Sequence, residues 1–186
     1  MATSTEHDAH YLAIGKMLVL FQSLEATLKD GLVLLVNNQI GTPGGQLAYA
    51  TISQLSFRAA TLLASALPAT FTVERIGAKD GESSKRLEQA LTEAEGQLKE
   101  GIKLAAEVEQ RRNQLVHSRW FISPEIVSTP GRMTRTKTKT KAGSMSIELA
   151  IESIADIDAN TEKERKAQAL IGSALRDYQR IAQHVW

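Results

Sequence analysis

Arg112, Asn113 and His117 lie within six residues of one another in the segment QRRNQLVHSRW, residues 110–120. Their side chains could act together on a phosphate group. The planar guanidinium of arginine matches phosphate oxygens, and histidine can take up or release a proton near neutral pH. Asparagine can orient an imidazole or donate to an oxyanion. Cleavage of RNA by attack of the ribose 2′-hydroxyl needs a base, a stabilising charge and an acid, and these groups suffice for it without a metal.

A long amphipathic helix, expected from about Glu82 to about Arg119, carries these three side chains. With about 100° of rotation per residue, Arg112 falls in the middle of the apolar face. Asn113 and His117 then lie one turn apart on the flank of that face. A guanidinium in an apolar face is costly unless it is paired, so it binds either a carboxylate or a phosphate. Glu25 of the first helix could pair with Arg112 or orient His117, and solvent exposure is the alternative for Glu25.

A homodimer would complete such a site, because one histidine cannot readily act as base and acid in the same reaction. A two-fold interface brings the same patch of both chains face to face. We therefore expect two copies of His117 across one cleft, with the apolar face around Arg112 at the interface.

Four helices and one hairpin account for most of the chain. Apolar residues at helical spacing predict helices over about 5–35, 46–66, 82–119 and 161–184. Residues 134–141 alternate threonine with arginine or lysine, which is typical of a strand, and residues 144–149 can pair with it after a turn at 142–143. We predict a single domain over residues 1–186. Its fold class is all-α, a four-helix bundle with a small β-hairpin insertion at about 132–149 before the last helix.

Composition excludes several kinds of site. The chain has no cysteine, which excludes disulfides, thiol nucleophiles and cysteine-ligated zinc. We expect no metal and no cofactor, because His7 and His10 lie at a terminus where capping or exposure explains them better than metal binding. The most apolar region contains Glu25, Lys29 and Asp30, so it predicts an amphipathic helix and not a membrane span. We expect a soluble, cytoplasmic protein.

Positive charge is concentrated between residues 101 and 141, which carry nine basic and three acidic side chains. The segments before and after it are net acidic. Such a segment could bind RNA phosphates, although a solvated basic loop is the alternative. No aromatic residues interleave with the strand cations, so the contacts would be to phosphates and would depend on salt. The candidate RNA-binding residues are Arg111, Arg119, Arg135, Lys137, Lys139 and Lys141.

The string RRNQLVHSRW resembles the signature of the HEPN superfamily (higher eukaryotes and prokaryotes nucleotide-binding). That signature is an arginine, often followed by asparagine, and then a histidine, with four to six residues between the arginine and the histidine. The helix order and the string FQSLEATL in the first helix are also similar. Members of this superfamily are helical bundles, often dimeric, and many are metal-independent endoribonucleases in phage defence, toxin–antitoxin systems or RNA processing.

The resemblance implies that Arg112, Asn113 and His117 are catalytic. It also implies RNA as the substrate, a homodimer, and an antitoxin or regulatory protein as a partner. Toxins of this superfamily that pair with a minimal nucleotidyltransferase often have tyrosine two residues after the histidine. This chain has Arg119 there, which argues against that partnership.

Two functions agree with this resemblance. The first is a metal-independent endoribonuclease with a composite site in a dimer. The alternative is a non-catalytic HEPN-like module that binds RNA, a nucleotide or a partner protein. Two His117 side chains across one cleft would favour the enzyme, and an Arg112 fully paired with Glu25 would favour the module.

Overall fold

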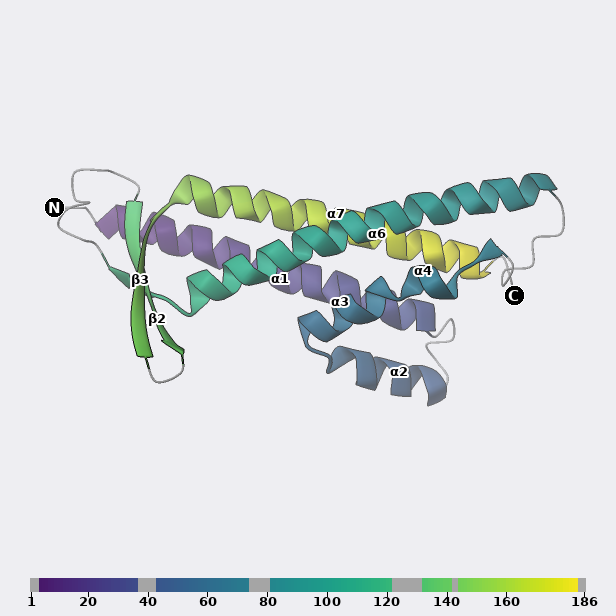
Figure 1. The fold of residues 1–186 in the computed structure, drawn as a ribbon, viewed down its shortest axis with the longest axis horizontal. Helices are drawn as coiled ribbons and strands as arrows, with labels where there is room; N and C mark the ends of the chain where they lie inside the picture. Colours follow the sequence, from purple (N-terminus) through teal and green to yellow (C-terminus); the bar gives the residue numbers. More distant parts are fainter. Residues whose placement is uncertain (1–3, 37–42, 74–80, 122–131, 142–143, 184–186) are drawn as a thin grey trace. The chain divides into compact units, whose positions relative to one another are not determined.

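The computed structural model describes residues 4–36, 43–73, 81–121, 132–141 and 144–183. It is mostly helical, with a small three-stranded antiparallel sheet before the last helix (Figure 1). Among the described residues, no helix has the length and apolar character needed to cross a bilayer. The elements in chain order are α1 (Ser4–Val36), α2 (Pro43–Ser53), α3 (Phe57–Ser65), α4 (Leu67–Thr70), α6 (Gly81–Val116), β1 (Arg119–Phe121), β2 (Arg132–Lys141), β3 (Ser144–Ser153) and α7 (Ile154–Gln183).

The three long predicted helices are confirmed, with changed ends. Helix α1 begins at Ser4, α6 ends at Val116, and α7 begins at Ile154, before the expected residue 161. The early start of α7 has a local cause. The Ser153 hydroxyl accepts a hydrogen bond from the Asp156 amide at 3.1 Å, and the Asp156 carboxylate accepts one from the Ser153 amide at 3.1 Å. This reciprocal capping satisfies amides that a helix start leaves unpaired.

The prediction of four helices is wrong, because the segment 46–66 is not continuous. Helix α2 ends at Ser53, and Ser56 has an extended backbone that begins α3. The Ser56 hydroxyl accepts a hydrogen bond from the Ala59 amide at 3.2 Å, as an N-cap does. A serine in an apolar helical pattern therefore starts a new helix here.

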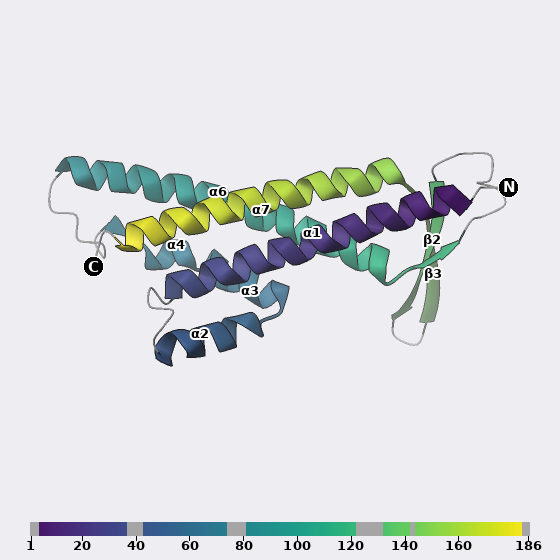
Figure 2. The same cartoon turned by 180° about the vertical axis from the view of Figure 1, so that it is seen from behind.

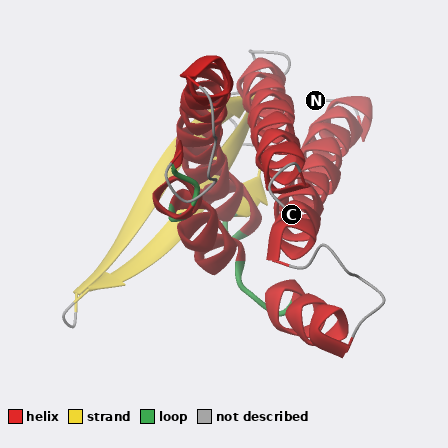
Figure 3. Cartoon of the chain, turned by 90° about the vertical axis from the view of Figure 1, so that its right-hand side faces the viewer, coloured by secondary structure: helices red, strands yellow, loops and turns green. Residues whose placement is uncertain are grey.

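The predicted hairpin is confirmed and is longer than expected. Strand β2 pairs antiparallel with β3 over their full lengths, from Arg132 opposite Ser153 to Lys141 opposite Ser144. The predicted turn at 142–143 lies outside the described residues. Strand β1, which the sequence analysis assigned in part to the preceding helix, pairs with the other edge of β2, so the three strands form one sheet (Figure 3).

The two faces of the sheet differ sharply in what they expose. Residues directly opposite each other in an antiparallel pair share a face, so the β2 threonines lie on the face of the apolar side chains of β3. Those apolar side chains are exposed, from 50% at Ile151 to 72% at Met145. We call them the exposed sheet face: Met145, Ile147, Leu149 and Ile151. The opposite face carries Arg135 and Glu152, each only 3% exposed. Along β3 the apolar side chains are therefore exposed and Glu152 is buried, the reverse of the usual arrangement.

The contacts of the chain divide it into two compact units. Unit 1 comprises residues 1–21 and 107–164, and unit 2 comprises residues 22–106 and 165–186. The single-domain assignment over 1–186 stays a prediction. Within unit 1, the end of α6 leads into the sheet, and β3 leads directly into α7 (Figures 1 and 2). Its core is Ala13, Met17, Leu115 and Ile157, with Ile14, Leu18, Trp120 and Ile154 packed against it.

Unit 2 is packed through small residues at close helix contacts. A Cβ atom at Gly101 of α6 would lie 2.7 Å from Ile171 Cγ1, and one at Gly31 of α1 would overlap Leu175 of α7. The amide of Gln168 adds polar contacts by donating to the hydroxyls of Ser23 and Thr27, at 2.8 and 2.9 Å. Helices approach this closely only where a side chain is missing.

Candidate functional site

His117 lies directly after the last residue of α6, and the residues that follow it complete the helix end. The His117 amide bonds to the Asn113 carbonyl at 3.3 Å, continuing the helical pattern by one residue. The Ser118 hydroxyl donates to the Gln114 carbonyl, and the Trp120 indole donates to the Leu115 carbonyl at 3.0 Å. The last carbonyls of a helix need such partners. The sequence that follows His117 thus fixes its backbone.

Arg112 is half-buried on the side of α6 that faces α1 within unit 1. Its guanidinium carbon lies 5.3 Å from the centre of the Phe21 ring, a cation–π distance, and its Nη1 donates to Asn113 Oδ1 at 3.0 Å. Its Nε is buried with no hydrogen-bond partner. Among the described residues, no carboxylate forms an ion pair with Arg112. Phe21 and Asn113 therefore hold the guanidinium in position, and no carboxylate of the described residues neutralises its charge.

Asn113 and His117 lie on the flank of this cation, one turn apart as the helical spacing predicts. Asn113 is half-buried, and the His117 side chain is exposed to solvent. Asn113 is bound to the guanidinium, and its carbonyl accepts the backbone amide of His117. Asn113 therefore contacts both the Arg112 guanidinium and the backbone of His117.

Glu25, the expected partner or orienting residue, pairs elsewhere. It forms an ion pair with Lys29 at 2.7 Å, within the part of α1 that belongs to unit 2. Lys29 also donates to the Ser53 carbonyl at 3.1 Å. Glu25 is thus a helical (i, i+4) partner for a lysine, which accounts for its presence without Arg112.

Arg111 and Arg135, two of the candidate RNA-binding residues, belong to a buried ion cluster: Arg111, Arg135, Glu148 and Glu152. Glu152 lies at its centre. Arg111 binds both carboxylate oxygens of Glu152, one of them at 2.9 Å, and Arg135 Nε donates to the same carboxylate at 2.8 Å. Arg135 is also 3.7 Å from Glu148. The expected row of exposed strand cations is therefore incomplete, because Arg135 is buried and paired.

The other candidate RNA-binding residues are placed differently. Arg119 is exposed on β1, opposite Thr136, and Lys137 is half-buried on β2 opposite Glu148. Lys139 and Lys141 belong to β2 by their backbone, and their side chains lie outside the described residues. Of the candidate RNA-binding residues whose side chains the structure describes, Arg119 is therefore the exposed one.

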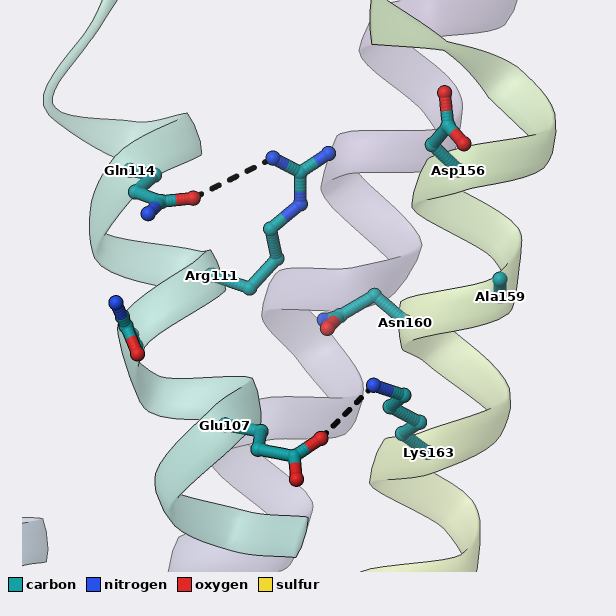
Figure 4. Close-up of a pocket in the computed structure, with 8 residues that line it drawn as sticks. Glu107, Arg111, Gln114, Asp156, Ala159, Asn160 and Lys163 are labelled. Carbon is teal, nitrogen blue, oxygen red and sulfur yellow. Dashed lines mark hydrogen bonds and ion pairs between the residues drawn. The ribbon is translucent and has the colours of Figure 1, made fainter.

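A polar pocket of about 380 Å³, which was not predicted from the sequence, lies between α6 and α7 of unit 1 (Figure 4). It is lined by Glu107, Gln110, Arg111 and Gln114 of α6 and by Asp156, Ala159, Asn160 and Lys163 of α7. The α6 residues recur at helical spacing on one face, and this repeat of polar residues was the available signal. The residues from α7 could not be assigned to the same place without the fold.

The charged groups of this pocket are already bound. Lys163 pairs with Glu107 at 2.9 Å, and Arg111 belongs to the buried ion cluster. The bonds from Ser153, first the hydroxyl and then the amide, lower the pKa of Asp156, and the charge of Arg111 adds to this effect. The polar groups of the pocket that remain available to a ligand are therefore mainly side-chain amides.

Within the described part of the chain, no group of three or more histidine or acidic side chains is arranged to hold a metal ion. Comparisons of the chain with protein-family models, with curated proteins and with solved structures find no match. The function is therefore inferred from the geometry of the site and from the resemblance of its motif.

Proposed function

We propose that this chain is a metal-independent endoribonuclease of the HEPN-like kind, with Arg112, Asn113 and His117 as its catalytic residues. The observation that supports this most is the state of Arg112. Its guanidinium is half-buried over Phe21, is bound by Asn113, and has no carboxylate partner among the described residues. An unneutralised cation at low exposure is a strong site for an RNA phosphodiester or for a phosphorane-like transition state.

The proposed reaction uses the three groups in sequence. His117 takes the proton of a ribose 2′-hydroxyl, whose oxygen attacks the adjacent phosphorus. Arg112 stabilises the charge that develops on the phosphate oxygens, and Asn113 holds Arg112. The 5′-oxygen of the next nucleotide leaves with a proton from a second histidine, and the product ends in a 2′,3′-cyclic phosphate.

We assign the second histidine to a second copy of the chain. The exposed sheet face of unit 1 supports this assignment, because its four apolar side chains are between 50% and 72% exposed and carry no charge. Apolar patches of this kind mark interfaces, so two copies can meet through it. The expected dimer becomes monomeric in Leu149→Glu. Light scattering checks this, with Leu62→Glu, which changes an exposed leucine of α3, as the control.

A ribonuclease of this kind needs control in the cell. We propose that the protein acts in phage defence or as a toxin, and that an antitoxin or regulatory protein is its partner. RNA phosphates would also contact Arg119 and the lysines of β2.

The test incubates the purified protein with structured and single-stranded RNA in EDTA and identifies the new ends. We expect 2′,3′-cyclic phosphate ends with the wild type, and a loss of on the order of 100-fold in rate for Arg112→Ala and for His117→Ala. Arg58→Ala, which changes an exposed arginine of α3, is the matched control and should cleave normally. RNA that binds to Arg112 without being cleaved would overturn the enzyme and support the non-catalytic binding module.

A further inference from the structure

We propose that the pocket between α6 and α7 binds one nucleobase of the RNA and makes cleavage selective for that base. This inference rests on the proposed function, because it names the part of the substrate that the site would recognise. The pocket belongs entirely to unit 1, like the Arg112, Asn113 and His117 motif. Its volume of about 380 Å³ falls in the range of small-ligand pockets, about 300–1,000 Å³.

The charge balance of the pocket favours a neutral ligand. Glu107 and Lys163 neutralise each other at 2.9 Å, and Arg111 is bound by Glu152. Figure 4 shows the Glu107–Lys163 pair and the Arg111–Gln114 contact at 3.4 Å along the walls of the pocket. A phosphate would have to break one of these pairs, whereas an uncharged ligand leaves them intact.

The groups that remain are amides, and amides recognise bases. Gln110 and Asn160 each offer a carbonyl acceptor beside an NH₂ donor, and Gln114 offers its NH₂ donor beside the carbonyl that accepts from Arg111. The edge of a nucleobase presents donors and acceptors in the same plane, and Asn and Gln side chains pair with it through two hydrogen bonds. Unstacked RNA bases are commonly read in this way.

Asn160 gives an independent sign of a ligand. Its side chain is only 6% exposed and points from α7 toward α6 (Figure 4). Its Nδ2 is buried with no hydrogen-bond partner among the described residues. A buried donor without a partner is destabilising, and a ring nitrogen or carbonyl of a base would supply the missing acceptor.

The pocket shares a strip of the α6 surface with Asn113 and His117, while Arg112 projects from another side of the helix, over Phe21. Gln110, Asn113, Gln114 and His117 follow the spacing i, i+3, i+4 and i+7, so they form one strip of the helix surface. Gln110 and His117 are two turns apart, about 10 Å along the axis. A nucleotide with its base at Gln110 would therefore place a neighbouring phosphate near His117.

The first test measures binding without cleavage. Adenosine, guanosine, cytidine and uridine are titrated one at a time into the protein, followed by NMR, with ribose 5-phosphate as the ligand that has no base. We expect one nucleoside to bind in preference, and Gln110→Ala to weaken it about tenfold. Gln89→Ala, at the other end of α6, should bind normally. Equal binding of all four, no binding, or preferred binding of ribose 5-phosphate would each overturn the inference.

A second variant distinguishes a loss of binding from a loss of folding. Asn160→Leu removes the unpaired donor at nearly constant shape, so the variant should be at least as stable as the wild type while binding is lost. Retained binding in this stable variant would also overturn the inference. Because nucleosides contain no scissile phosphate, a nucleoside that binds while RNA stays intact contradicts the ribonuclease and not the pocket. Cleavage that continues unchanged in Gln110→Ala, with the same base preference, contradicts the pocket and not the ribonuclease.

Discussion

The Nη1 atom of Arg112 donates a 3.0 Å hydrogen bond to Oδ1 of Asn113, the next residue of α6. Neighbouring residues of a helix point about 100° apart, so the arginine must bend along the helix surface to reach its neighbour. The same guanidinium lies over Phe21. These two contacts hold the cation at the border of the apolar face. Asn113 therefore acts within the proposed catalytic group by holding Arg112 in position.

Replacement of Asn113 by aspartate tests whether the charge of Arg112 matters. The aspartate keeps the hydrogen-bond acceptor but forms an ion pair that neutralises the guanidinium. We expect Asn113→Asp to lower the rate of RNA cleavage on the order of 100-fold, with an unchanged melting temperature. A structural role of Arg112 predicts the opposite, an active and more stable variant. Single-turnover cleavage and thermal melting distinguish the two.

Glu152 should dominate the stability of unit 1. It is 3% exposed and is bound by both Arg111 and Arg135, so a neutral side chain there leaves two cations without their shared negative charge. We expect Glu152→Gln to lower the free energy of unfolding by about 3–5 kcal/mol. Glu148→Gln is the matched control, because Glu148 is more exposed, and its effect should stay below about 1 kcal/mol. Urea unfolding measures both, and equal effects would contradict a buried cluster centred on Glu152.

Two glycines of α6 should respond in opposite directions to alanine. Nothing lies within 4 Å of a Cβ placed on Gly96, so alanine there should raise the free energy of unfolding by about 1 kcal/mol through helix propensity. A Cβ on Gly101 would lie 2.7 Å from Ile171 Cγ1 and 3.2 Å from its backbone nitrogen. We expect Gly101→Ala to destabilise by about 1–3 kcal/mol. Thermal unfolding of the two variants checks the close contact, and a stabilised Gly101→Ala would contradict it.

The cap of α7 should make stability depend on pH. The hydrogen bonds from Ser153 lower the pKa of Asp156 below its usual 3.8. The carboxylate therefore stabilises the folded state above about pH 3.8, and this contribution is lost as the pH falls through the lower folded value. We expect Asp156→Asn to be less stable than the wild type at pH 7, with a difference that shrinks below pH 3.8.

The matched variant removes the other half of the same cap. Ser153→Ala should cost about 1 kcal/mol at pH 7. Urea midpoints of both variants at pH 7 and pH 3 give the comparison. A difference between Asp156→Asn and wild type that stays constant over this range would mean that the charge of Asp156 has no part in the cap.

The helices and the local part of the site were predictable, because their signals are local. Apolar spacing predicted α1, α6 and α7, and the one-turn relation of Asn113 and His117 follows from helical geometry alone. The cap Ser153–Asp156 was present in the sequence as a serine three residues before an aspartate, and it was overlooked. The pairing of Arg111 with Glu152, 41 residues away, and the position of Phe21 under Arg112 depend on tertiary packing. No local pattern contains them.

The burial of charged side chains in the sheet also determines which register of its strands is stable. Strand β2 repeats threonine and a cation every two residues, so sliding it by two residues against β3 leaves both faces chemically similar. Such a strand does not select its own alignment. Arg135 differs from the lysines that follow it because its guanidinium binds Glu152 inside unit 1, and a slipped hairpin would place a lysine or Met133 there instead. The bond between the buried Arg135 and Glu152 thus fixes the register of a hairpin whose sequence is otherwise repetitive.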